Sequence, residues 1–481
     1  MVRSLLLNII EYIDRFKVFL IISIAFILAY WIGQHISKGI YISILIVILL
    51  LCLYKKIEFL LPLALFADAQ FGGLIPMKYL SFYSTIHKGE FFFIVLLFYS
   101  ILHFEEIKPY FNHIITKIIL IWVLYVIFQI IVSSARYDEP LIAIFARTRH
   151  TLKILYFIPF LFLNTEEKIT KFIKISLIFM SLVVIMYVGV TLLKIPISST
   201  YYVVQEKEFG GIPMRRVYAN IAYTPILGFF FLAKALTRPG IRSKTILYLL
   251  FSLFFLVPIL LAFGRGSWLN NIFAISLIFF FSLKKYGNKE VTTKFVNLGI
   301  LVVLFFIVLN ILGRIGFENP SDLFHAMKAR FTSSVSDFQS TSGTYEIRVE
   351  DELPVLFETI AKNPILGIGL DPGWQAVRRP SMLTRAIADI RPLAQIVIWG
   401  IPGIVIIIIS TIVFVKFSLQ KLKIATDNTW CLLLAVFIHY IKGAATFFFF
   451  PGIITYWGAL LVTLPSEEIK DSQNNSSDKN V

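Results

Sequence analysis

The sequence predicts an all-α fold: a polytopic integral membrane protein with about 12–14 transmembrane helices and one long helical loop outside the membrane. Of its 481 residues, 58% are hydrophobic and only 15% are charged. The mean hydropathy is +0.80, a balance that soluble domains of this length do not carry. Long uncharged runs recur along the chain, and such runs are typical of membrane-spanning helices.

Fourteen apolar segments are candidate spans, judged against the roughly 17–25 residues that a helix needs to cross a bilayer. They are residues 17–33, 40–54, 57–67, 90–104, 114–134, 141–163, 170–193, 218–236, 245–263, 266–283, 295–312, 393–416, 429–445 and 447–464. Segment 57–67 is short and also fits a half-span or re-entrant piece. Segment 141–163 contains Arg147, Arg149 and Lys153, and the last two segments are separated by almost no chain. The number of spans therefore stays at about 12–14.

The charge and the cysteines exclude several classes of function. A net charge of +16 would suggest nucleic acid in a soluble protein, but the chain has no basic motif with interleaved aromatics. Positive charge on the cytoplasmic side and contact with anionic lipid explain the excess better. Cys52 and Cys431 lie in separate apolar segments and form neither a zinc site nor a disulfide framework. No His/Asp/Glu set has metal-ligand spacing, so we expect no metal and no cofactor.

Lysine and arginine in short loops set the expected orientation. With fourteen spans, four basic loops fall on one side, which we assign to the cytoplasm together with both termini: Lys55 and Lys56; Arg238, Arg242 and Lys244; Lys284, Lys285, Lys289 and Lys294; Lys416, Lys421 and Lys423. The opposite side then receives residues 68–89, 194–217, the turn at Arg265 and the stretch 313–392. The chain accordingly divides into a transmembrane bundle, a long outward loop with short amphipathic helices, C-terminal transmembrane helices and a disordered tail: residues 1–312, 313–392, 393–464 and 465–481.

Two helices are predicted inside the long loop. An Asn-Pro-Ser-Asp sequence predicts one over Ser321–Phe331, and a second spans Glu350–Lys362. In the second helix, helical spacing places Leu353, Leu356 and Ile360 on one apolar face. Glu352 and Glu358 are expected to lie outside that face. Asn363-Pro364 ends this helix, and Gly367-Ile368-Gly369 predicts a turn.

Arginines in the outer segments are exceptions to the positive-inside rule and therefore need a separate explanation. Arg265 lies in Gly264-Arg265-Gly266-Ser267-Trp268, a turn between two spans. A guanidinium binds phosphate oxygens through paired hydrogen bonds and keeps its charge in a dry setting. Further arginines of the outer segments are Arg215, Arg216, Arg348, Arg378, Arg379, Arg385 and Arg391. Together they predict an anion-binding site on the outer membrane face.

Plainer interpretations of these arginines remain open. Arg265 can extend its charge to the lipid headgroups from a helix start. Arg215 and Arg216 fit a solvated loop that meets headgroups. Arg348 precedes three acidic residues, and each exposed ion pair there is worth less than about 1 kcal/mol.

In combination, these segments resemble the O-antigen ligase and O-antigen polymerase superfamily of bacterial membrane glycosyltransferases. Residues 264–268 are similar to the family's Ser-Arg-Gly-Ala-Trp turn. Residues 363–370, Asn-Pro-Ile-Leu-Gly-Ile-Gly-Leu, are similar to its Pro-Leu-Leu-Gly-Val-Gly signature in the long periplasmic loop. Arg348, 16 residues before Pro364, matches the arginine that precedes the amphipathic helix. The resemblance covers roughly residues 210–410.

The resemblance implies a metal-independent glycosyltransferase in the bacterial plasma (inner) membrane, active on its outer face. The donor would be a glycan on undecaprenyl pyrophosphate, and the acceptor a second lipid-linked glycan in a polymerase, which we favour, or a lipid A core in a ligase. Arg265, Arg215, Arg216, Arg348 and Arg391 would bind the pyrophosphate and stabilise its growing charge. Chain-length regulator or flippase proteins would be further partners.

One departure from the family concerns the end of the long loop. Ligases of this family carry a His-Asn pair shortly before a glycine, and Asp389-Ile390 stands at the matching place before Gly400. Asp389 is then either the catalytic base or half of an interfacial ion pair with Arg391. An aspartate has a reference pKa of about 3.9, so it is a weaker base than histidine unless the site raises its pKa.

A transporter or lipid flippase is the alternative from another class, because many apolar spans fit it equally. Such proteins more often have two similar halves with broken helices near the midplane. The sequence contains no such halves, and its unusual charges lie at one membrane face.

Overall fold

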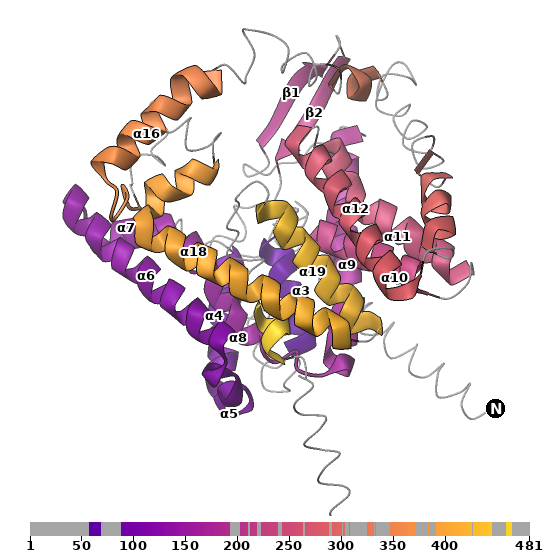
Figure 1. Ribbon diagram of the computed structural model, residues 1–481, viewed down its shortest axis with the longest axis horizontal. Helices are drawn as coiled ribbons and strands as arrows, with labels where there is room; N and C mark the ends of the chain where they lie inside the picture. The colour runs from indigo at the N-terminus through magenta and orange to yellow at the C-terminus, as the bar shows by residue number, and fades with distance from the viewer. Residues whose placement is uncertain are drawn as a thin grey trace, which may run out of the picture.

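The computed structural model describes a predominantly helical molecule with one β-hairpin (Figure 1). The described residues are 57–68, 88–192, 203–209, 212–218, 223–238, 243–262, 265–287, 291–300, 302–303, 307, 325–330, 332, 347–370, 383, 391–425, 427–444 and 458–463. The predicted spans 17–33 and 40–54 and the tail 465–481 lie outside them. The first half of the described chain contains α3 (Ile57–Asp68), α4 (Lys88–Leu102), α5 (Phe104–Ile107), η3 (Lys108–Asn112), α6 (Ile114–Tyr137), α7 (Leu141–Thr148), η4 (Arg149–Tyr156), α8 (Phe157–Phe160) and α9 (Glu166–Leu192).

The second half begins with the hairpin and continues with longer helices. Its elements are β1 (Val203–Phe209), β2 (Ile212–Tyr218), α10 (Thr224–Thr237), α11 (Ser243–Leu261), α12 (Arg265–Tyr286), the π-helical turn η5 (Ile347–Glu352), α16 (Leu353–Lys362), α18 (Arg391–Ile424) and α19 (Asp427–Ala444). Five helices of the described chain are long and apolar enough to cross a membrane: α6, α9, α11, most of α12 and most of α18. Their positions agree with five of the predicted spans.

One predicted span is wrong, and two features of the structure were not predicted. Residues 141–163 form two short α-helices around the 3₁₀ segment η4, whose start coincides with Arg149 and the polar stretch that follows. The span predicted over 393–416 agrees with α18, but the break at Gly400 inside this helix was not predicted. The hairpin β1–β2 was not predicted, although Gly210-Gly211 between two alternating stretches is a hairpin signal.

Large apolar side chains form an exposed belt on the outer helices. α10 is buried along almost its whole length among α11, α12 and α19, so it forms the centre of this part of the bundle. The surrounding helices expose Ile121, Leu124, Ile127 and Phe128 on α6, Ile185 on α9, Leu247 and Leu250 on α11, Ile272 and Phe280 on α12, and Ile401, Ile408 and Ile412 on α18. Exposed apolar surface of this extent is typical of helices that contact lipid.

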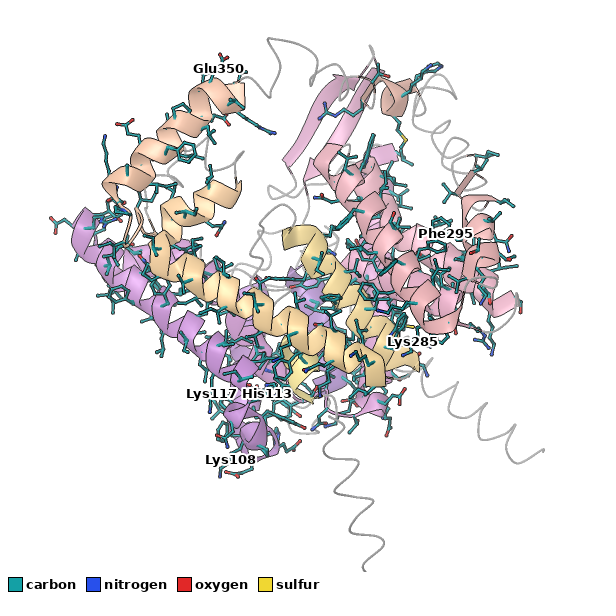
Figure 2. All side chains as sticks on the ribbon, viewed as in Figure 1. Lys108, His113, Lys117, Lys285, Phe295 and Glu350 are labelled. Atoms are coloured by element: carbon teal, nitrogen blue, oxygen red, sulfur yellow. The ribbon has the colours of Figure 1, made fainter. Side chains whose placement is uncertain are left out.

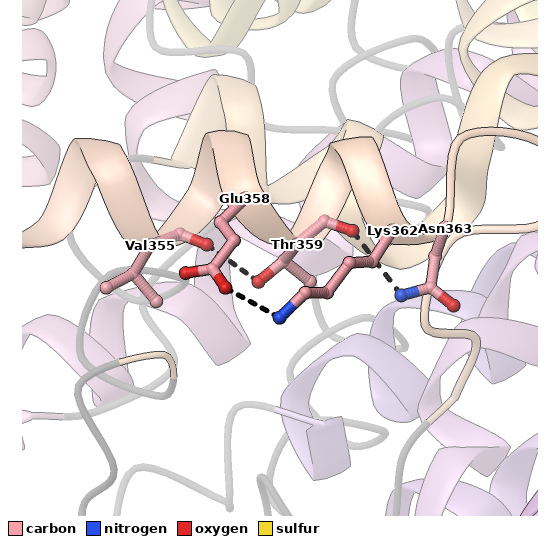
Figure 3. Close-up of polar contacts among 5 residues, drawn as sticks. All are labelled: Val355, Glu358, Thr359, Lys362 and Asn363. Carbon is pink, nitrogen blue, oxygen red and sulfur yellow. Dashed lines mark hydrogen bonds and ion pairs between the residues drawn. The ribbon is translucent and has the colours of Figure 1, made fainter.

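α16 confirms the predicted amphipathic helix in the long loop. Leu356 is fully buried and Glu358 is exposed, as predicted. At its end, Thr359 Oγ1 donates to Val355 O at 2.7 Å and Asn363 Nδ2 donates to Thr359 O at 3.4 Å (Figure 3). Asn363 caps the helix just before Pro364, as the sequence indicates.

An ion pair on the solvent side of α16 joins Lys362 Nζ to Glu358 Oε1 at 2.6 Å (Figure 3). This hydrogen bond and the charge of Lys362 lower the pKa of the Glu358 carboxyl. Its contribution to stability is therefore present above the ordinary glutamate pKa and is lost as the pH falls. Because the pair is fully exposed, that contribution is small.

Three of the predicted cytoplasmic loops meet at one end of the bundle through contacts of two lysines. Lys285 Nζ donates to Ala425 O at 2.7 Å, which joins the end of α12 to the end of α18. Lys294 Nζ donates to Leu236 O at 3.3 Å and to Arg238 O, which joins residues 291–300 to the end of α10. Figure 2 shows Lys285 in the lower half of the view and Glu350 of η5 at the upper edge.

The start of α6 belongs to this same lysine-rich end. The rings of His113 and Phe417, near the end of α18, lie 5.2 Å apart between centroids. Burial, and secondly the charge of Lys421, lower the pKa of the His113 imidazole. Neutral His113 caps α6 by accepting the Ile115 N–H at 3.2 Å on Nδ1.

We expect the lysine-rich end to face the cytoplasm and the segment 313–392 to face outward. After replacement of Cys52 and Cys431, single cysteines at Gln339 and Asn288 should be labelled by a membrane-impermeant maleimide from opposite sides. Gln339→Cys should react in intact cells, and Asn288→Cys only after permeabilisation. Reaction of both from the same side would contradict the topology.

Candidate functional site

The predicted site residues lie on separate elements of the described chain. Arg215 and Arg216 are in β2, Arg265 is the first residue of α12, and Arg391 is the first residue of α18. Arg348 is an exposed residue of the π-helical turn η5. Asp389, Arg378, Arg379 and Arg385 lie outside the described residues.

The elements that carry these arginines lie toward one end of the molecule. Figure 1 shows the hairpin, the start of α12 and the start of α18 in the upper part of the view, and Figure 2 shows Glu350 of η5 at the upper edge. The contacts of Lys285 place the other end of α12 at the lysine-rich end. Arginine-bearing and lysine-bearing segments therefore occupy opposite ends of the bundle.

The turn before α12 is fixed by local hydrogen bonds. Trp268 Nε1 donates to Leu260 O at 3.1 Å, which ties the first turn of α12 to the end of α11. Asn271 Nδ2 donates to Ser267 O at 2.6 Å on the inner side of the same helix. The tryptophan of the Gly-Arg-Gly-Ser-Trp sequence thus holds the helix start at which Arg265 is placed. N–H groups in a first helical turn lack partners within the helix and favour a negative charge.

The register of the hairpin distinguishes its two arginines. Glu206 of β1 pairs with Arg215 of β2, and Gln205 pairs with Arg216. Directly opposite residues share a face of an antiparallel pair, while successive residues occupy opposite faces. Arg215 therefore shares its face with a carboxylate, and Arg216 shares its face with a neutral amide.

This register predicts that Arg216 matters more than Arg215 for binding a pyrophosphate. Arg216→Ala should weaken binding of undecaprenyl pyrophosphate by about 10-fold, because a charged hydrogen bond is lost. Arg215→Ala is the matched control, with an expected change below about 3-fold. The measurement is a titration of purified protein in neutral-lipid nanodiscs, and equal losses for both variants would contradict the assignment.

One expectation for the turn around Arg348 is wrong. Glu352 was expected off the apolar face, but it is buried with 0% exposure. It lies four residues before Leu356, and residues at that spacing share a helix face. Arg348 lies one turn earlier and remains exposed.

The segment 363–370 fills the break in α18. Gly400 has φ 64° and ψ −171°, which interrupts the helix. Ile368 N–H donates to Val397 O at 2.7 Å, Gly369 N–H donates to Ile398 O at 3.1 Å, and Ile401 N–H donates to Pro364 O at 3.1 Å. The backbone N–H and C=O groups that lose their helical partners at the break therefore form hydrogen bonds with this segment. A chain segment that is shielded from water needs such bonds.

A polar stripe on α6 holds this segment from the other side. Gln129 Nε2 donates to Leu366 O at 3.1 Å, Arg136 Nη1 to Gly367 O at 2.6 Å, and Tyr137 Oη to Ile368 O at 2.7 Å. Ser133 Oγ accepts the Leu370 N–H at 2.8 Å, and Tyr125 Oη donates to Trp399 O. The segment that resembles a family signature thus connects α6, α16 and α18, and so positions the elements that begin near Arg348 and Arg391.

The polar stripe on α6 was not predicted. Its signal is a set of polar residues at helical spacing in an apolar span: Tyr125, Gln129, Ser133, Arg136 and Tyr137. Polar residues inside a span face partners in the protein interior, so this pattern predicts a buried contact.

Comparisons add no assignment to this geometry. Among the residues that the structure describes, no group of three or more His, Cys, Asp or Glu side chains is arranged to hold a metal ion. The sequence matches no known protein family and no curated protein.

Proposed function

We propose that this chain is a polytopic integral membrane glycosyltransferase that uses an undecaprenyl-pyrophosphate-linked glycan on the outer face of the bacterial plasma (inner) membrane. The observation that carries the proposal is that the arginine-bearing segments lie toward one end of a helical molecule with exposed apolar side chains on its outer helices. The opposite, lysine-rich end agrees with the positive-inside rule. An anionic substrate that lies in the lipid would meet arginines at that end and apolar helices beside it.

The proposed reaction exchanges one glycosidic bond for another. An acceptor hydroxyl oxygen attacks the anomeric carbon of the donor, and the bond from that carbon to the phosphate oxygen breaks. The electron pair leaves with the lipid pyrophosphate, whose growing charge Arg265 and its neighbours stabilise. The proton of the hydroxyl passes to Asp389. Helices of the long loop would cover the site and limit attack by water.

Polymerisation is favoured over ligation within this proposal. The support is the aspartate that stands where ligases of the resembled family carry His-Asn. A polymerase takes a second lipid-linked glycan as acceptor, whereas a ligase takes a lipid A core. The polysaccharide profile of a deletion strain separates the two: a single repeat on the core indicates a polymerase, and lipid-linked polymer without attached glycan indicates a ligase.

A transporter or flippase is the second candidate, and the broken helix α18 is the observation that favours it. Broken helices in transporters expose backbone groups to a substrate. Here the groups at the break bond to residues 364–369, and the side chains of α6 hold the same segment. Because residues 364–369 already occupy the backbone groups at the break, the break fits a rigid connection between α6 and α18 better than a transport site.

Reconstituted protein tests the proposal directly. Purified protein in liposomes, given its lipid-linked glycan, should form longer or transferred glycans and release undecaprenyl pyrophosphate. Turnover should continue in excess chelator, because arginines supply the charge stabilisation. Movement of the lipid-linked glycan across the bilayer without any new glycosidic bond would support the flippase instead. Activity lost in chelator and restored by magnesium or manganese would contradict the metal-independent mechanism.

Asp389 is the proposed base, so Asp389→Asn should reduce transfer by about 100-fold or more while donor binding survives. The amide keeps the size of the side chain but cannot accept the proton. Wild-type activity should rise with pH as the carboxyl loses its proton. Asp351→Asn, at an exposed carboxylate beside Arg348, is the control and should stay near wild type. Near-normal transfer by Asp389→Asn with an unchanged pH profile would reject the base.

A further inference from the structure

Lys442 is a charged side chain among the helices of the bundle. It lies near the end of α19, an otherwise apolar helix, and is partly buried. Its Nζ donates to Asn271 Oδ1 of α12 at 3.0 Å and lies 5.3 Å from the centroid of the Phe229 ring of α10. None of the ion pairs among the described residues includes it. A neutral amide is thus its hydrogen-bond acceptor within the described chain.

His439 lies one turn before Lys442 on the same helix. It is 5% exposed, and within the described part of the chain its Nδ1 has no hydrogen-bond partner. Its ring centroid is 6.2 Å from that of Phe229, the ring that Lys442 also contacts. Two polar groups of one helical turn therefore face α10 and α12, and neither has an anionic partner among the described residues.

Helix packing places this pair beneath the start of α12. α19 runs antiparallel to α12: Trp430 contacts Tyr286 at the lysine-rich end, with 5.7 Å between ring centroids, and Lys442 reaches Asn271 at the other. Asn271 is six residues after Arg265, about 9 Å along the helix axis. Its amide orientation is fixed by the bond to Ser267 O, so Oδ1 is held toward Lys442.

We propose that Lys442 and His439 form an inner anion subsite that binds one phosphate of a lipid-linked pyrophosphate, while the arginine segments bind the other. A cation inside a membrane bundle is costly unless it is paired or used, and the described chain offers it no acid. The apolar helices around it suit a ligand whose remainder is hydrocarbon. Asn271 keeps the ammonium in place when the subsite is empty. This inference rests on the proposed function, since it names how the same substrate is held.

Binding by Lys442 variants tests the subsite. Purified protein in phosphatidylcholine nanodiscs is titrated with undecaprenyl pyrophosphate, with undecaprenyl monophosphate and phosphatidylglycerol as separate ligands. Lys442→Met preserves the length of the side chain and should weaken pyrophosphate binding by about 10-fold or more. Lys442→Arg keeps the charge and should lose less. The monophosphate should bind more weakly than the pyrophosphate to the wild type, and the difference should shrink in Lys442→Met.

Lys234→Met is the matched control. Lys234 also stacks on an aromatic ring of α10, 5.7 Å from the centroid of Phe230, but it lies at the lysine-rich end, and its variant should bind as the wild type does. Thermal unfolding of each variant checks that the fold is intact, and His439→Phe serves as a second variant with an expected smaller loss. Equal binding by Lys442→Met and wild type would overturn the subsite, as would a stronger response to phosphatidylglycerol than to the pyrophosphate. A wild type that binds no undecaprenyl pyrophosphate would instead overturn the proposed function.

Discussion

Gly400→Ala should destabilise the protein by about 4 kcal/mol or more, which is near the upper end for one substitution. Gly400 has φ 64°, and a Cβ there would lie 2.2 Å from Ile365 O and 2.6 Å from Gly367 N. Both neighbours are backbone atoms of the segment that fills the break in α18, so neither can rotate away. The clash would separate segment 363–370 from α18 and release the contacts with α6.

Two other glycines isolate the steric part of this effect. Gly287 has φ 90° with nothing within 4 Å of an added Cβ, so Gly287→Ala should cost only about 1–2 kcal/mol for the left-handed backbone. Gly299 is helical and equally open, so Gly299→Ala should be neutral or slightly stabilising. Thermal unfolding of the purified variants and their amounts in membranes provide the measurement. Similar unfolding temperatures for Gly400→Ala and Gly287→Ala would contradict the tight packing of segment 363–370 against Gly400.

Local signals in the sequence predicted most of the helices. Asn363-Pro364 predicted the end of α16, and the turn at Arg265 predicted the boundary between α11 and α12, because both boundaries depend on neighbouring residues. The apolar runs predicted α6, α9 and α11 for the same reason. The break at Gly400 depends on a segment about 30 residues away that donates and accepts its hydrogen bonds. No local sequence pattern predicts a contact between segments so far apart in the chain.

The candidate site was predictable only in part. Counting the spans placed Arg215, Arg265 and Arg348 on one side of the membrane, and their elements lie toward one end of the molecule. The stripe on α6 and the neighbours of Lys442 become visible only when distant helices are packed together. Charge inside an apolar span marks a residue as unusual, but its partners depend on tertiary contacts.

Arg265→Ala should reduce glycan transfer by about 100-fold or more with little change in stability. Arg265 begins α12 at the arginine end, where the helix start also favours negative charge. As the sugar–oxygen bond breaks, charge accumulates on the lipid pyrophosphate, and a guanidinium already in place stabilises it. Arg265→Lys keeps the charge but loses the paired hydrogen bonds, so its activity should lie between those of Arg265→Ala and the wild type.

Arg238→Ala is the control for this experiment, because it removes the same side chain at the opposite end. Arg238 follows α10 and lies 5.8 Å from the ring centroid of Tyr248 at the lysine-rich end. Its variant should transfer glycan at the wild-type rate if charge matters only where the pyrophosphate lies. The assay is transfer by reconstituted protein at equal amounts of folded enzyme, with donor binding measured in parallel. A role limited to binding would raise KM and leave kcat unchanged, whereas stabilisation of the leaving group lowers kcat. Wild-type transfer by normally folded Arg265→Ala would remove Arg265 from the site and shift the proposed pyrophosphate contact to Arg216 and Lys442.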